Sequence, residues 1–119
     1  MAKHLKTGKR GEQIAVEYLE RKGYQILDTN WRFSRAELDI VAKDGDILVF
    51  VEVKTRSYDH FGKPETAVTA RKEYLIIDAA SVYMETKGHD WEIRFDIIAI
   101  VMKSEREIDI EHFMDAFIP

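Results

Sequence analysis

The 119-residue chain contains no cysteine. This absence excludes disulfides, thiolate zinc sites and a cysteine nucleophile. With only 2 prolines and 6 glycines, the composition is not that of a disordered or low-complexity chain. No apolar run approaches ~20 residues, so we expect no membrane span, and the basic residues 1–6 lack the apolar stretch of a signal peptide. We therefore expect a cytoplasmic protein that forms one domain over residues 1–119.

A large positive charge is also missing, because the formal net charge is −4. Residues 1–72 nevertheless carry 14 Lys/Arg and 11 Asp/Glu, a net +3, whereas residues 73–119 carry 4 and 11, a net −7. Composition alone favours a solvated surface with uneven charge, but a local basic face that contacts nucleic acid is compatible with it. The candidates for such contacts are Arg10, Arg32, Arg35, Arg56, Lys63 and Lys72.

Several common catalytic motifs are absent from the sequence. It has no phosphate-binding loop, no dinucleotide fingerprint, no Gly-x-Ser-x-Gly and no His-Glu-x-x-His. The histidines at positions 4, 60, 89 and 112 are scattered, and we interpret them as unrelated surface residues. Trp31 and Phe33, beside Arg32 and Arg35, could stack on bases, but partly buried sheet aromatics are the simpler interpretation.

Hydrophobic periodicity predicts the order α-β-β-β-α-β. A helix over 8–22 carries an apolar stripe, with Thr7 at its start and Gly23 at its end. The remaining expected elements are an extended segment 24–33, strands 37–42, 47–54 and 94–102, a polar loop 57–66, and a second helix 67–86 with Val68, Leu75, Ala79 and Val82 on one side. Residues 108–117 are compatible with a strand or a helix. This order indicates an α/β fold with a mixed sheet between helices.

The strand over 47–54 is apolar on both faces near its start. Ile47, Val49 and Val51 point to one face, and Leu48 and Phe50 to the other. A strand that is buried on both sides has this pattern. We therefore expect it at the centre of the sheet, with one helix on each face.

Charged side chains gather where this strand ends. Glu37 and Asp39 are two residues apart on one strand, as are Glu52 and Lys54 on the next. The turn around Gly45 favours a two-residue hairpin loop. If Gly45 is the second loop residue, Glu37 faces Glu52; if it is the first, Asp39 faces Glu52 and Glu37 faces Lys54. Both registers place the four side chains on one face.

Three carboxylates around one lysine suggest a bound cation, because opposed carboxylates normally destabilise a sheet. Oxygen ligands without paired Cys or His suit Mg²⁺ or Mn²⁺. Such an ion activates water and braces a phosphate, and a nearby lysine stabilises the developing charge. A surface salt-bridge cluster is the alternative, and the pattern alone does not decide. Glu12, which flanks the apolar face of the first helix, could join the site or simply face solvent.

The residues that carry this pattern resemble a known family. Asp39 followed by Glu52-Val53-Lys54 after a hairpin resembles the PD-(D/E)xK nuclease signature, and the whole chain resembles the uncharacterised bacterial YraN family of that superfamily. The supporting stretches are residues 8–12 with Ala15, Tyr18-Leu19 and Gly23-Tyr24, and residues 30–32, 37–40, 49–56, 61–62 and 94–99.

The resemblance implies a restriction-endonuclease-like fold and similarity to archaeal Holliday-junction resolvases. It implies that Glu12, Asp39, Glu52 and Lys54 form one catalytic site, with Asp39, Glu52 and Glu12 as metal ligands. Glu37 belongs to the family motif and is an accessory candidate. The chain has Ala36 where that motif has glycine, and Leu38 where the superfamily name has proline.

Two functions follow as expectations. The first is a Mg²⁺-dependent nuclease that hydrolyses phosphodiester bonds of structured or branched DNA. The second is a catalytically silent nucleic-acid-binding module with the same fold. The small size and the thin basic complement favour help from a homodimer or a protein partner.

Overall fold

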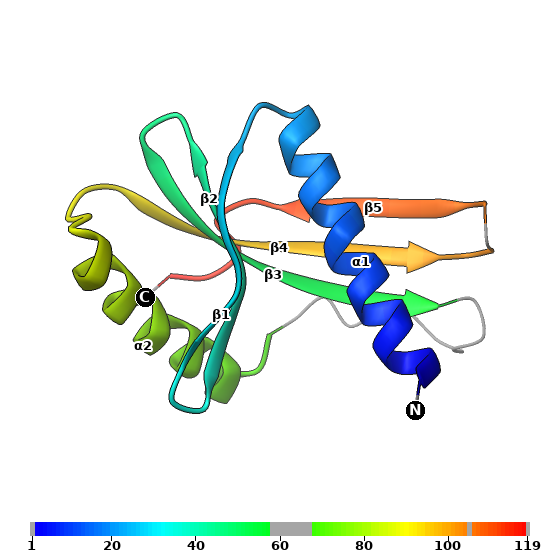
Figure 1. Ribbon diagram of the computed structural model, residues 1–119, viewed down its shortest axis with the longest axis horizontal. Helices are drawn as coiled ribbons and strands as arrows, with labels where there is room; N and C mark the ends of the chain where they lie inside the picture. The colour runs from blue at the N-terminus through cyan, green and yellow to red at the C-terminus, as the bar shows by residue number, and fades with distance from the viewer. Residues whose placement is uncertain (1, 58–67, 105, 119) are drawn as a thin grey trace.

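The structure is a computed structural model that describes residues 2–57, 68–104 and 106–118 (Figure 1). Its elements are α1 (Ala2–Arg21), β1 (Gln25–Phe33), β2 (Ala36–Asp44), β3 (Ile47–Ser57), α2 (Ala70–Lys87), β4 (Ile93–Met102) and β5 (Ile108–Phe113). The expected order is confirmed, and the C-terminal segment that the sequence left open adds a strand, β5. Apart from Ser57, which ends β3, the loop expected over 57–66 lies outside the described residues.

The five strands form one mixed sheet in the spatial order β1-β2-β3-β4-β5. β3 and β4 run parallel, while the other neighbouring strands are antiparallel. β3 is the central strand, as its two-sided apolar pattern predicted. A mixed sheet with a helix on each face is consistent with the restriction-endonuclease-like fold.

Each helix buries one apolar cluster against the sheet. On the α1 face, Ala15 and Leu19 belong to a cluster with Ile40, Val49, Val51, Ile98 and Ile100. On the α2 face, Ile76, Ala79, Ala80 and Tyr83 pack with Leu48, Phe50, Phe95 and Ile97. None of the helices in the described ranges is long and apolar enough to cross a membrane.

The helix ends differ from the expected ones in three places. α1 begins at Ala2, so Thr7 lies inside the helix and does not cap it. α2 begins at Ala70 and not at 67, because the Thr69 side chain accepts a hydrogen bond from the Lys72 N–H and caps the helix. The buried stripe of α2 is Ile76, Ala79, Ala80 and Tyr83, so of the expected residues only Ala79 belongs to it. The predicted ends at Gly23 and Gly88 are confirmed, and both residues have positive φ.

The side-chain alternation of β2 breaks at Asp39. Ala36 and Leu38 belong to the α2-face cluster, whereas Ile40 and Ala42 belong to the α1-face cluster. Strict alternation would place all four on one face. The β1–β2 hairpin twists across the sheet in this region (Figure 1), so simple alternation does not place Glu37 relative to Asp39.

Candidate functional site

The β2–β3 hairpin brings Asp39 and Glu52 to the same level of the sheet. Asp44 pairs with Ile47, so the loop is Gly45-Asp46, which is the second of the two registers the sequence allowed. Gly45 takes a positive φ of 63° in this tight turn. The regular pairing ends at Ile40 and Val51. Asp39 and Glu52 are the next residues on each strand, at the point where the two strands part.

The Asp39 side chain takes the place of the missing strand partner. Its Oδ2 accepts a hydrogen bond from the Val53 backbone N–H at 2.9 Å. A buried backbone N–H without a partner costs free energy, so this contact stabilises the open end of the β2–β3 ladder. It also fixes the Asp39 carboxyl beside β3, where Glu52 lies.

Lys72, in the first turn of α2, also reaches the site. Its Nζ lies 3.2 Å from Glu52 Oε1, and the Glu52 side chain is 5% exposed. The sequence interpretation placed Lys72 among nucleic-acid contacts and missed this ion pair. The sequence carried no signal for it, because Glu73 stands beside Arg71 and Lys72 in the first turn of α2 and supplies a local carboxylate.

Burial raises the proton affinity of both carboxyls. Burial, followed by the charge of Glu52, raises the pKa of Asp39 to about 7. Burial also raises the pKa of Glu52, although Lys72, Lys54 and the hydrogen bond with Asp39 oppose this. Burial lowers the pKa of Lys72, but the charges of Glu52, Asp39 and Glu37 outweigh burial and raise it. The pair therefore attracts positive charge at neutral pH.

α1 brings Glu12 to the same region through a close helix–strand crossing. A Cβ on Gly11 would lie 2.1 Å from Thr55 Oγ1, so only glycine permits this approach of α1 to β3. Burial raises the pKa of Glu12, as do the charges of Asp39 and Glu37, whereas a hydrogen bond with Asn30 lowers it. Glu12 thus lies within electrostatic reach of Asp39, and its hydrogen bond is with Asn30. Its role as a metal ligand, which the resemblance implies, stays a prediction.

Glu37 and Lys54 do not face each other in the β2–β3 ladder, which ends before it reaches them. Glu37 pairs instead with Arg32, whose Nε lies 3.2 Å from Glu37 Oε2. The Arg32 side chain is 76% exposed, so this ion pair adds little stability. Lys54 is half-buried two residues beyond Glu52, and its charge lowers the pKa of Glu52.

The other predicted nucleic-acid contacts are spread around the site. Arg10 and Arg35 lie at exposed positions on α1 and in the β1–β2 turn. Arg56 lies at the end of β3, and its buried Nε has no hydrogen-bond partner in the part of the chain that the structure describes. Such a donor is suited to an anionic ligand. Lys63 lies outside the described residues.

The donor set fits a hard divalent cation. Asp39 and Glu52 supply carboxylate oxygens, and Mg²⁺ is commonly bound by one or two carboxylates together with water and substrate phosphate. In residues 2–57, 68–104 and 106–118, no three His, Cys, Asp or Glu side chains are arranged to hold a metal ion by themselves. An ion held by Asp39 and Glu52 would therefore take its other ligands from water or from a phosphate.

A second charged network, which the sequence interpretation missed, lies on the α1 face. Asp96 is fully buried and accepts two hydrogen bonds from Arg94, at 2.8 and 2.9 Å. Its Oδ2 also lies 2.7 Å from His112 Nε2, and the Asp115 N–H donates to Oδ1 at 3.0 Å. Burial raises the pKa of Asp96, but these hydrogen bonds outweigh it and hold the pKa below its usual value.

The network corrects the interpretation of the histidines. The His112 side chain is 4% exposed, and His89 is buried with its Nε2 3.0 Å from the Glu92 carbonyl oxygen. Neither is a surface residue. Trp31, by contrast, is the partly buried sheet aromatic that was expected, with its ring edge-on to Tyr83 at 5.2 Å. The same expectation is wrong for Phe33, which is exposed at the end of β1.

Comparison with known proteins identifies relatives over nearly the full length. The family model described as "Uncharacterised protein family UPF0102" matches residues 11–100. A UPF0102 protein of Flavobacterium psychrophilum is 52% identical over 117 residues, with 98% of each chain covered. One of Christiangramia forsetii is 47% identical over 117 residues, again with 98% of each covered. One of Chlorobium phaeobacteroides is 46% identical over 116 residues, which cover 92% of this chain and 91% of the relative.

Proposed function

The chain belongs to the UPF0102 family, and because that name states no activity, we propose from the site itself that it is a metal-dependent nuclease. The observation that carries the proposal is the pair of buried carboxyls, Asp39 and Glu52, set side by side where β2 and β3 part. Buried acids that repel each other destabilise a fold unless a cation or a proton lies between them. The resemblance to PD-(D/E)xK nucleases supports the same assignment.

Each residue then has a defined role. Asp39 and Glu52 would hold Mg²⁺ or Mn²⁺, which when bound supplies an acidic water and polarises a phosphate. Glu12, half-buried and near Asp39, would hold a water molecule by hydrogen bonding. Lys54 stabilises negative charge that develops on the phosphate. Lys72 neutralises Glu52 in the free protein and can turn to a substrate phosphate when a metal ion replaces it.

Structured or branched DNA is the substrate that we propose. The exposed Arg32 and Arg35 lie on the β1–β2 hairpin. Arg56, at the end of β3, has a buried Nε without a hydrogen-bond partner among residues 2–57, 68–104 and 106–118. Phosphate contacts of this kind bind nucleic acid without reading sequence. Since these cations are few, we propose that a second copy of the chain or a protein partner extends the surface.

A cleavage screen tests the activity directly. Purified protein is incubated with single-stranded, duplex, flap and four-way DNA, and with RNA, in Mg²⁺ or Mn²⁺. We expect metal-dependent cleavage of at least one branched substrate, and loss of it in Asp39→Asn and Glu52→Gln. Glu85→Gln, at an exposed position on α2, is the matched control and should cleave normally.

The second candidate function is a nucleic-acid-binding module without turnover. The Lys72–Glu52 ion pair favours it, because an internal cation already compensates the charge that a metal ion would compensate. In that case the wild type binds DNA in a salt-sensitive manner and cleaves nothing in either metal. Binding without cleavage on every substrate would refute the nuclease and retain the module; absence of binding would refute both.

A further inference from the structure

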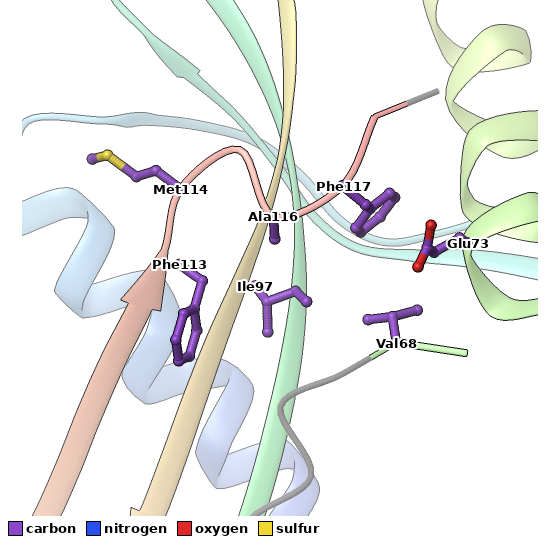
Figure 2. A pocket seen from close by; sticks show the side chains of 7 residues that line it. All are labelled: Val68, Glu73, Ile97, Phe113, Met114, Ala116 and Phe117. Atoms are coloured by element: carbon purple, nitrogen blue, oxygen red, sulfur yellow. The ribbon is translucent and has the colours of Figure 1, made fainter. Parts of the chain in front are cut away.

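A hollow of about 360 Å³ opens between the C-terminal segment and the start of α2 (Figure 2). Its lining combines one carboxylate with six apolar side chains: Glu73 with Val68, Ile97, Phe113, Met114, Ala116 and Phe117. The candidate nuclease site does not include any of these residues. The hollow is large enough for a small organic ring system.

The hollow lies next to the candidate site in the sheet. Glu52 of β3 pairs with Ile97 of β4, and Ile97 pairs with Phe113 of β5. The three residues therefore form a row across adjacent strands, with the carboxylate at one end and the aromatic ring at the other. Since neighbouring strands lie about 4.8 Å apart, the row from Glu52 to Phe113 spans on the order of 10 Å. Two consecutive residues of α2 also connect the hollow with the candidate site: Lys72 contacts Glu52, and Glu73 lines the hollow.

The wall formed by the C-terminal segment is held in place. The Phe117 ring stacks on Phe95 with the ring centroids 4.9 Å apart. The Ala116 N–H donates to the Phe95 carbonyl oxygen at 2.7 Å, and the Asp115 N–H donates to the buried Asp96. The hollow is thus preformed, so a ligand need not order its wall on binding.

The charges around the row separate two kinds of ligand group. On the Glu52 side, Lys72 contacts Glu52 and the charge of Lys54 acts on it, and both cations attract phosphate oxygens. On the far side, Glu73 repels phosphate and accepts hydrogen bonds from amino groups, such as those on the edges of bases. An apolar, aromatic-lined hollow with one acceptor is complementary to a nucleobase.

We propose that this hollow receives an unpaired nucleobase next to the phosphate that lies at Asp39 and Glu52. The inference rests on the proposed function and narrows its substrate class. A base in a duplex is stacked and paired, and must be extruded before it can enter a pocket. The substrate is therefore a nucleic acid with an unpaired nucleotide beside the scissile phosphate, as at a flap, a junction or a single-stranded end.

The test measures binding and not cleavage. Affinities of the full protein, with Ca²⁺ in place of Mg²⁺, are measured for a short single-stranded oligonucleotide and for versions in which one base at a time is removed. We expect removal of one particular base to weaken binding about 5- to 100-fold, the usual loss for a stacked base. Ala116→Leu, which puts a larger side chain into the hollow where a base would lie, should abolish this dependence. Ile118→Leu, on the exposed neighbouring residue, should leave it intact.

Glu73→Gln tests the same pocket if thermal melting shows that Ala116→Leu does not fold. It exchanges the acceptor for an amide and should change which base is preferred at that position. Equal affinity of all the abasic oligonucleotides, an abasic effect that survives in folded Ala116→Leu, or an unchanged base preference in Glu73→Gln would overturn the pocket. The outcomes separate the two proposals: a base-dependent affinity without any cleavage refutes only the nuclease, and cleavage without base dependence refutes only the pocket.

Discussion

The Asp39→Asn substitution is expected to stabilise the protein at high pH and to leave its stability nearly unchanged at low pH. The pKa of Asp39 is raised from 3.8 to about 7 by burial and by Glu52. The folded state therefore holds a proton that the unfolded state releases between about pH 4 and pH 7. The free energy of unfolding falls as the pH rises through that window. Asparagine resembles the protonated acid and can still accept from the Val53 N–H.

The size of the effect follows from the shift. A difference of about 3 pKa units corresponds to about 4 kcal/mol if Asp39 titrates alone. Glu52 and Lys72 share the titration, so about half of this, ~2 kcal/mol, is the expected gain at pH 8. For a chain of this size that gain raises the melting temperature by roughly 8 °C. At pH 4 the gain should vanish.

Urea denaturation of wild type and Asp39→Asn at pH 4, 6 and 8 measures the predicted trend. Asp78→Asn, at an exposed position on α2, is the control and should match the wild type throughout. Added Mg²⁺ should raise the midpoint of the wild type and not that of Asp39→Asn. A variant that is less stable than the wild type at pH 8 would show that the charged carboxylate is a structural requirement, and the reasoning about repulsion would be wrong.

Three further predictions concern separate parts of the molecule. Lys54→Ala should reduce cleavage by about 100-fold or more while DNA affinity, which several contacts share, changes much less; a proportional loss of both in filter binding and kinetics would contradict this. Gly11→Ala should cost about 1–3 kcal/mol in urea unfolding, because its Cβ would overlap Thr55, and Thr55→Ala in the same chain should recover part of the loss. Asp96→Asn should cost about 3–5 kcal/mol, because it removes the buried negative charge beside Arg94 and leaves that guanidinium with Asp44 as its remaining carboxylate. Since the pKa of Asp96 is lowered, its contribution is full above the unfolded pKa and is lost as the pH falls below it, so the gap between variant and wild type should close in acid.

Sequence patterns predicted the layers of the fold because those layers depend on local periodicity. The two-sided apolar run in β3 placed it at the centre, and Gly23 and Gly88 marked the helix ends. The start of α2 was misplaced by three residues, since Val68 continues the apolar pattern while the backbone turns into the helix only at Thr69. Residues 108–113 gave no clear period, and their pairing with β4 decides that they form a strand.

Of the site residues, the sequence related only those that the register of the β2–β3 hairpin brings together. Gly45 restricted Asp39 and Glu52 to two registers, both of which put them on one face, and the structure selects one. The Lys72–Glu52 and Asp96–His112 contacts were missed because the partners are twenty and sixteen residues apart in sequence. The Arg94–Asp96 pair, two residues apart on β4, could have been found from the sequence and was overlooked. A contact between a helix and a sheet, or between distant strands, has no fixed separation in sequence, so a sequence pattern does not predict it.

Asp39 lies where β2 and β3 separate, and it links the two strands through its side chain. One carboxyl oxygen of Asp39 accepts the last hydrogen bond between the two strands, from the Val53 N–H. The charge of the same carboxyl is part of the candidate site. A proton or a metal ion bound to the Asp39 carboxyl therefore affects both the pairing of β2 with β3 and the binding of a ligand. A change in the charge of Asp39 should therefore change the strength of its hydrogen bond with the Val53 N–H. The hydrogen-exchange rate of the Val53 amide should report whether a proton or a metal ion is bound at the site.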